Sequence, residues 1–182
     1  MKRVIISPPA LAPAALAGLK DWLAITTPRD DAALETLLRA ALELCEAFTG
    51  QMPLAAPCEE ILPAATGWQA LSTRPVQAIA GVDGVADDGA RFIFEPGGYA
   101  IDMTADGRGL VRLSQRGPTD RIAVRFTAGM AAGWADLPEG IRHGAVRLAA
   151  HHYRQRDLDA MQSVPPAAVA ALWRPWRRMR VA

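Results

Sequence analysis

Three histidines are the first candidates for chemistry, because imidazole is the commonest metal ligand and the usual general base near neutral pH. His143, His151 and His152 all lie in one stretch with helical periodicity. A zinc site on a helix needs ligands four residues apart, as in H-E-x-x-H, and that spacing is absent. We therefore predict no metal site and no catalytic role, and expect these imidazoles to make local hydrogen bonds.

Paired carboxylates are the second candidates, because two acids that converge can share acid–base work. The pairs are Asp30 with Asp31, Glu59 with Glu60, and Asp87 with Asp88. The first pair is expected to cap a helix, the second to lie on a solvated strand edge, and the third to form a turn. The sequence contains no phosphate-binding loop, dinucleotide fingerprint or G-x-S-x-G elbow. We predict that the protein is not an enzyme, with no catalytic residues and no cofactor.

The two cysteines, Cys45 and Cys58, are too few for a disulfide framework in a chain of 182 residues. Cys45 falls on the apolar side of a predicted helix, where a small buried thiol is the ordinary role of a free cysteine. The default compartment is then a reducing cytoplasm.

The last eleven residues combine bulky aromatic groups with positive charge and contain no acidic side chain. Tryptophan and arginine are enriched in the best-buried parts of protein interfaces. Pro175 should stop a regular helix, so we expect the segment after it to be extended until a partner orders it. The alternative is a solvated basic tail. The candidate interface residues are Trp173, Arg174, Trp176, Arg177, Arg178, Met179 and Arg180.

Composition restricts the class of protein further. The chain is 51% hydrophobic and 21% charged, with a formal net charge of +1, so it can bury a core and carries no large basic footprint for nucleic acid. The apolar run near the N-terminus is broken by Pro8 and Pro9 and is too short for a signal peptide or a membrane span. We expect a soluble, unprocessed protein that does not bind membranes.

The strongest predicted element is a helix over residues 28–50, ended by Gly50. Its apolar stripe consists of Leu34, Leu37, Leu38, Ala41, Leu42, Cys45 and Phe48. Proline opens a short helix over residues 13–24, and a capping box from Asp136 to Glu139 opens a helix that runs to about Arg156. A last short helix should begin at Pro166 and end near Trp173. Gly144 inside the third helix suggests a close approach by another helix.

Between these helices the chain breaks into short apolar runs separated by turn residues. The predicted strands are residues 59–62, 68–72, 76–82, 91–94, 99–103, 109–113 and 122–127. The predicted turns are at residues 83–84, 88–89, 97–98 and 106–107. The fold class is therefore α+β, a small helical bundle with an inserted antiparallel β subdomain. The predicted parts are residues 1–50 (arm and first helices), 51–130 (β subdomain), 131–171 (later helices) and 172–182 (tail).

A series of motifs in this order resembles a known family. The motifs are L-K-x-W-L (residues 19–23), T-x-x-D-D-A-x-L (27–34), E-x-F-T-G (46–50), V-R-F-T-A-G (124–129), L-P-E-G-I-R-x-G-x-x-x-L-A-A-H-x-Y (137–153) and L-W-R-P-W-R-R-M-R (172–180). Together they resemble the head–tail connector (adaptor) proteins of long-tailed phages, which gene transfer agents also encode. The resemblance covers nearly the whole chain.

The resemblance implies a structural role with no catalytic residues. Connectors of this family form a ring, commonly of twelve subunits, beneath the portal protein. The ring extends the DNA channel, through which DNA passes without sequence recognition, and it provides the platform for the stopper or another tail-proximal protein. The implied partners are thus further copies of the chain, the portal, the stopper and the passing DNA. Assembly would take place in the bacterial cytoplasm, and the product would be a virion or gene-transfer-agent particle.

A second function from another class is a small nucleic-acid-binding module that places the C-terminal arginines on phosphates. The net charge of +1 argues against it, because such modules usually present a large basic surface.

Overall fold

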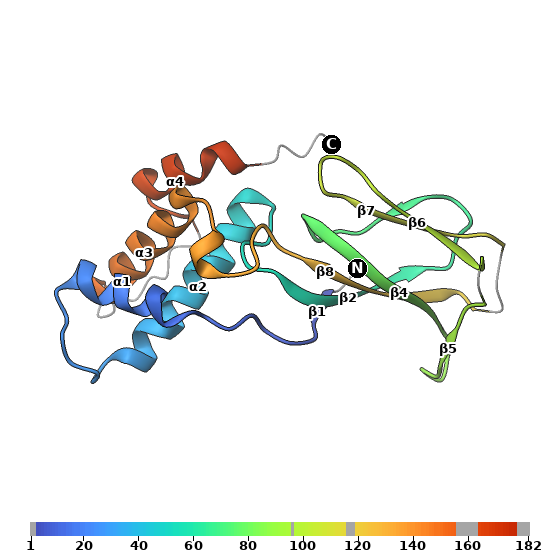
Figure 1. Ribbon diagram of the computed structural model, residues 1–182, viewed down its shortest axis with the longest axis horizontal. Helices are drawn as coiled ribbons and strands as arrows, with labels where there is room; N and C mark the ends of the chain where they lie inside the picture. Colours follow the sequence, from blue (N-terminus) through green and yellow to red (C-terminus); the bar gives the residue numbers. More distant parts are fainter. Residues whose placement is uncertain (1–2, 96, 116–118, 156–163, 178–182) are drawn as a thin grey trace. The chain divides into compact units, whose positions relative to one another are not determined.

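The computed structural model describes residues 3–95, 97–115, 119–155 and 164–177, and shows an α+β fold, as predicted (Figure 1). The chain forms two compact units. One, the β unit, comprises residues 1–9 and 55–129; the other, the helical unit, comprises residues 10–54 and 130–182. The chain therefore passes from one unit to the other three times.

The β unit contains two antiparallel sheets. The five-stranded sheet has the order β1 (Arg3–Ile5), β2 (Ala56–Pro63), β8 (Arg121–Ala128), β4 (Val76–Val85) and β5 (Arg91–Ile93). The three-stranded sheet has the order β3 (Gln69–Ala70), β7 (Gly109–Leu113) and β6 (Tyr99–Met103). All seven predicted strands are present, and β6 and β7 have the predicted bounds. The N-terminal arm contributes an eighth strand, because residues 3–5 pair with β2 instead of remaining unpaired.

One predicted turn is wrong. Asp83 and Gly84 lie inside β4, where Gly84 pairs with Phe92 of β5. The ring of Phe92 covers Gly84 so closely that a Cβ there would lie 2.1 Å from the ring carbon Cζ. The glycine therefore makes room for an aromatic side chain of the adjacent strand. The other predicted turns contain Gly89, Gly97 and Gly107 with positive φ.

The helical unit contains four α-helices and two short 3-10 turns among its described residues. These are α1 (Pro13–Leu23), α2 (Asp31–Thr49), η1 (Trp134–Asp136), α3 (Glu139–Arg154), α4 (Ala167–Trp173) and η2 (Arg174–Trp176). Of the predicted stripe on α2, Leu34, Leu38, Ala41, Leu42 and Cys45 are buried, and Leu37 and Phe48 pack partly buried against the same core. That core also contains residues of α1, α3 and α4, so each amphipathic helix buries its apolar side against the others.

The helix ends differ from the prediction at two N-termini and agree at one C-terminus. Asp30 does not cap α2: its carboxylate accepts a 2.6 Å hydrogen bond from the Tyr153 hydroxyl, while Asp31 pairs with Lys20 at 2.6 Å. Asp136 lies in η1 and does not cap α3, which follows Pro138. Gly50 closes α2 as predicted, with φ of 71° and its amide donating to the Glu46 carbonyl. At α2, residues distant in sequence thus bind the carboxylates that the sequence pattern assigns to a cap.

Candidate functional site

The C-terminal Trp/Arg segment was the predicted interface, and as far as Arg177 it packs into the helical unit. Trp173 is completely buried, and its indole Nε1 donates a 3.4 Å hydrogen bond to the carbonyl of Ile141 in α3. Its ring also lies 6.2 Å, centre to centre, from the ring of Phe48 in α2. Trp173 therefore belongs to the core that joins α2, α3 and α4.

Two glycines of α3 admit the tryptophans. A Cβ at Gly144 would lie 2.2 Å from Nε1 of Trp173, and a Cβ at Gly140 would lie 2.9 Å from the Trp176 ring. Positions 140 and 144 are one helical turn apart, so the two glycines form a smooth strip on one side of α3. The sequence predicts a close backbone approach by another helix at Gly144; the group that lies against this glycine is the indole side chain of Trp173 in α4.

The end of the described chain is tied down by two further contacts. The side-chain amide of Gln51, just after α2, donates a 2.5 Å hydrogen bond to the carbonyl of Trp176. The guanidinium of Arg177 lies over the Phe48 ring, 5.2 Å from its centre. Pro175 ends α4 as predicted, but the chain continues as the turn η2 and stays on its own helical unit.

This packing corrects one part of the predicted interface. Trp173 has no exposed surface, so it cannot insert into a partner, and its burial by the chain's own helices is the physical reason. Arg174 and Arg177 are exposed and Trp176 is half-buried, so these three stay predicted interface residues. Arg178, Met179 and Arg180 lie outside the described residues.

The histidines take separate places on α3. His143 meets the ring of Trp22 edge-on at 5.3 Å, and His151 and His152 have their ring centres 5.8 Å apart. Burial, and then the neighbouring His151, lower the pKa of His152 below its ordinary value. The described part of the chain contains no group of three or more His, Cys, Asp or Glu residues that could hold a metal ion.

A hollow on the helical unit was not predicted from the sequence. It has a volume of about 190 Å³ and lies between α1, α3 and the start of α4. Its polar lining is basic, from Arg147, His151 and Arg154, and the exposed Trp22 of α1 forms part of its wall. The three basic residues fall at steps of four and three along α3, which is the signal in the sequence that could have revealed them.

The second acidic pair differs from its predicted role. Glu59 is not simply solvated: its two carboxylate oxygens bind the Arg91 guanidinium at 2.5 and 2.7 Å, and this hydrogen bonding lowers the pKa of Glu59. Glu60 is completely buried. Its carboxylate accepts hydrogen bonds from the amides and hydroxyls of Ser72 and Thr73, at 2.6–2.9 Å. Glu60 thus holds the loop between β3 and β4 in place, a structural role for a carboxylate with four donors.

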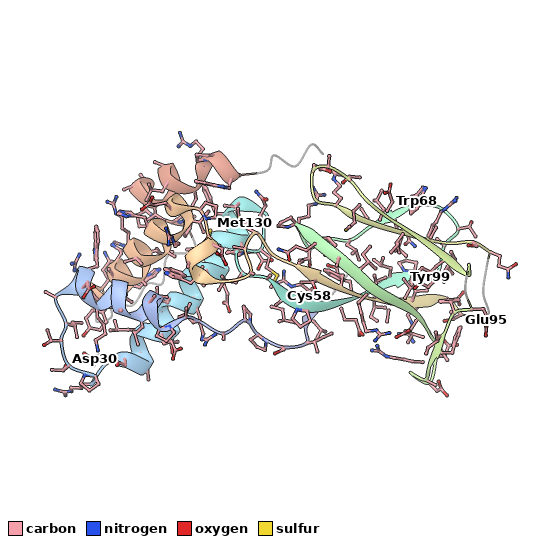
Figure 2. The ribbon with its side chains drawn as sticks, in the orientation of Figure 1. Asp30, Cys58, Trp68, Glu95, Tyr99 and Met130 are labelled. Atoms are coloured by element: carbon pink, nitrogen blue, oxygen red, sulfur yellow. The ribbon has the colours of Figure 1, made fainter. Side chains whose placement is uncertain are left out.

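Both cysteines are buried and free of disulfides. Cys45 lies on the apolar stripe of α2, where burial raises the pKa of its thiol to about 12. Cys58 lies on β2 (Figure 2). A thiol with so high a pKa is protonated at neutral pH, so Cys45 fills core volume and is not a nucleophile.

Comparison with known proteins finds similar chains in gene transfer agent particles. No protein-family model and no curated protein sequence matches the chain. Three solved structures match it over 100% of its length and over 98% of their own chains. They are the neck of an empty gene transfer agent (GTA) particle computed with C6 symmetry (26% identity, TM-score 0.80), the virion of a native GTA particle (26%, 0.73) and the neck of a native GTA particle computed with C12 symmetry (27%, 0.76).

The chain has the fold of a GTA neck chain. Because the match includes both the β unit and the helical unit, it supports the resemblance to head–tail connectors that the sequence motifs indicated. None of the helices in the described residues is long and apolar enough to cross a membrane.

Proposed function

We propose that this protein is a head–tail connector, an adaptor subunit in the neck of a gene transfer agent or long-tailed phage particle. Copies of the chain form a ring beneath the portal, commonly of twelve subunits, which extends the DNA channel and carries the stopper or another tail-proximal protein. The protein acts by its shape and its surfaces, without catalysis or a cofactor. Assembly takes place in the bacterial cytoplasm.

The observation that carries this proposal is the match to GTA neck chains over 100% of this chain and 98% of theirs, at TM-scores of 0.76 and 0.80. Those necks were computed with C12 and C6 symmetry, which fits a subunit that occurs in a ring. The buried side chains agree with a structural role, because Glu60, Trp173 and Cys45 all serve packing or hydrogen bonding within the chain.

The portal contact is proposed at the end of the helical unit. Arg174 and Arg177 are exposed there, and their guanidinium groups suit carboxylates of a portal subunit. Trp176 is half-buried on the same turn, and its exposed part can contact the partner. Arg178, Met179 and Arg180, which lie outside the described residues, are proposed as members of the same interface. Trp173 holds this surface in position, because its buried indole packs on Gly144 and bonds to Ile141 of α3 just before η2 begins.

The test is removal of the gene from a producing strain, followed by electron microscopy of the particles. The proposal predicts DNA-filled heads without tails, and recovery of tailed particles when the full chain is supplied. A chain that ends at Arg177 and carries Arg174→Ala and Arg177→Ala should fold but fail to co-purify with the portal. Tailed, infectious particles from the deletion strain would refute the proposed function.

A further inference from the structure

The basic hollow on the helical unit has no neutralising partner in the described chain. Arg147, His151 and Arg154 supply its polar lining, and no carboxylate lines it. Neither Arg147 nor Arg154 forms an ion pair with another described residue. Trp22 leaves 44% of its surface exposed beside these cations. A hollow that combines arginine with an exposed indole has the composition of a protein interface that receives an acidic segment.

A complementary acidic stripe lies on α2. Glu35, Glu43 and Glu46 fall, with Arg39, at steps of four, four and three, so the four side chains share one side of the helix. Glu43 is exposed, and Glu35 and Glu46 are half-exposed. The stripe contains three acidic side chains and one basic side chain, and Arg39 pairs with Glu35 at 3.5 Å. None of these residues lines the basic hollow, so one subunit can use both surfaces at the same time.

The charge of the helical unit is divided in the same way. Residues 10–54, which form α1 and α2, contain six acidic and three basic residues. The described residues after 129 in this unit contain five arginines and two acidic residues. Opposite charges on two separate surfaces of one subunit favour a head-to-tail contact between copies. Two acidic surfaces or two basic surfaces repel each other, whereas the acidic surface of one copy attracts the basic surface of the next.

We propose that the acidic stripe of α2 (Glu35, Glu43 and Glu46) docks into the basic hollow (Trp22, Arg147, His151 and Arg154) of the next copy of the chain. The contact is heterologous, since two different surfaces meet, and a heterologous contact closes into a ring when its rotation divides a full turn. This inference rests on the proposed connector function and names the surfaces through which its ring forms. The carboxylates neutralise the two arginines, and the indole of Trp22 is buried beside them.

The experiment reverses the charge of one surface at a time. One variant carries Arg147→Glu and Arg154→Glu, and the other carries Glu43→Arg and Glu46→Arg. Self-association of the purified full-length protein is measured by analytical ultracentrifugation at low salt, up to about 0.5 mM protein. At such concentrations even weak association, with a high Kd, can be detected. The matched control for the variant of the hollow, Arg29→Glu with Arg112→Glu, makes the same change in net charge as that variant at exposed arginines outside both surfaces. Circular dichroism verifies that each variant is folded, and Arg147→Gln with Arg154→Gln serves as a milder form.

Each variant alone should associate at least ~10-fold more weakly than the natural chain, because like charges then face each other in the contact. An equimolar mixture of the two should recover association, since the acidic hollow of one accepts the basic stripe of the other in an alternating ring. A chain that carries all four substitutions should recover as well, and the control should associate normally.

Several results would overturn the inference. The natural chain could stay monomeric over the whole concentration range, either charge variant could associate like the natural chain, or the mixture could fail to recover. These results are distinct from a failure of the connector function, which is decided by the tails on particles from the deletion strain. If the chain is required for tails but its self-association is unchanged by the charge reversals, its ring forms through other surfaces.

Discussion

Substitution of Gly144 by alanine has two opposing effects on stability: it favours the helical backbone of α3, and it places a methyl group against Trp173. Alanine in place of an interior glycine normally stabilises a helix by about 1 kcal/mol. Here the new Cβ would lie 2.2 Å from Nε1, 2.8 Å from Cε2 and 2.9 Å from Cδ1 of Trp173. These separations are well below the roughly 3.5–4.0 Å of a normal contact, so the indole must move.

The buried position of Trp173 decides which effect is larger. Its ring is fully enclosed and cannot swing into solvent, so its displacement disturbs Phe48 and the hydrogen bond to Ile141. Overpacking of a core costs roughly 1–3 kcal/mol, and an overlap this large belongs at the upper end of that range. After the helix gain is subtracted, we expect Gly144→Ala to lower the free energy of unfolding by about 2 kcal/mol, or the melting temperature by roughly 4–8 °C for a chain of this size.

Gly140→Ala provides the matched comparison. A Cβ there would meet Trp176 at 2.9 Å and the Leu172 carbonyl at 3.2 Å, but Trp176 is half-exposed and can shift outward. We expect it to cost less than half as much as Gly144→Ala. The measurement is urea unfolding of both variants, followed by circular dichroism and tryptophan fluorescence.

A double-mutant cycle with Trp173→Phe tests the cause directly. Phenylalanine lacks the indole nitrogen nearest to the new methyl group, so the double variant should lose less stability than the two single variants added together. If Gly144→Ala were as stable as the natural chain, or if the two losses were additive, the packing of Trp173 on Gly144 would be refuted.

Three further predictions concern buried or paired groups. Glu60→Gln should lower the free energy of unfolding by roughly 1–3 kcal/mol, because the amide nitrogen replaces one carboxylate oxygen and cannot accept the hydrogen bonds made to that oxygen. Ser72→Ala, which removes one donor hydroxyl, should cost less in the same urea titration. Cys45 should resist maleimide at pH 8 in the native protein and react in guanidinium chloride, since burial raises its pKa to about 12; equal rates, measured by mass spectrometry, would contradict its burial. The Arg91 hydrogen bond lowers the pKa of Glu59 in the folded state, so this pair should stabilise the protein at pH values above 4.5, the ordinary pKa of a glutamate, and lose its effect as the pH falls below that value. Arg91→Met should remove this part of the acid dependence of stability. An unchanged profile of stability against pH would contradict the pairing.

Local patterns in the sequence were enough to predict most of the fold. The stripe on α2 specified its buried side, because a helix of that period has one apolar surface to cover. Gly50 marked the end of α2 correctly, and Gly89, Gly97 and Gly107 marked turns, since each adopts the positive φ that glycine accommodates at little cost. The failures depended on residues distant in sequence: a turn at Gly84 is indistinguishable from a strand position until Phe92 of the next strand is known to cover it.

The candidate site was less predictable, for a related reason. Composition indicated that Trp173, Trp176 and the neighbouring arginines form an interface. It could not say whether the surface that they contact belongs to the same chain or to a partner. The basic hollow required the positions of α1 and α4 beside α3, and the role of Glu60 required the loop that follows β3. The spacing of Arg147, His151 and Arg154 places them on one side of α3, but periodicity does not say which distant segments lie beside them.

The glycine strip on α3 changes how the C-terminal segment should be tested. Because Gly140 and Gly144 receive the indoles of Trp176 and Trp173, a chain shortened before Trp173 would lose a core side chain together with the arginines. Large aromatic deletions in a core cost roughly 3–5 kcal/mol, so loss of portal binding by such a chain would report unfolding as readily as a missing contact. Only variants that keep residues up to Arg177 leave this core intact. Substitution of Arg174 and Arg177 on that background therefore removes exposed positive charge while Trp173 stays in the core, and it also removes the contact of Arg177 with the Phe48 ring.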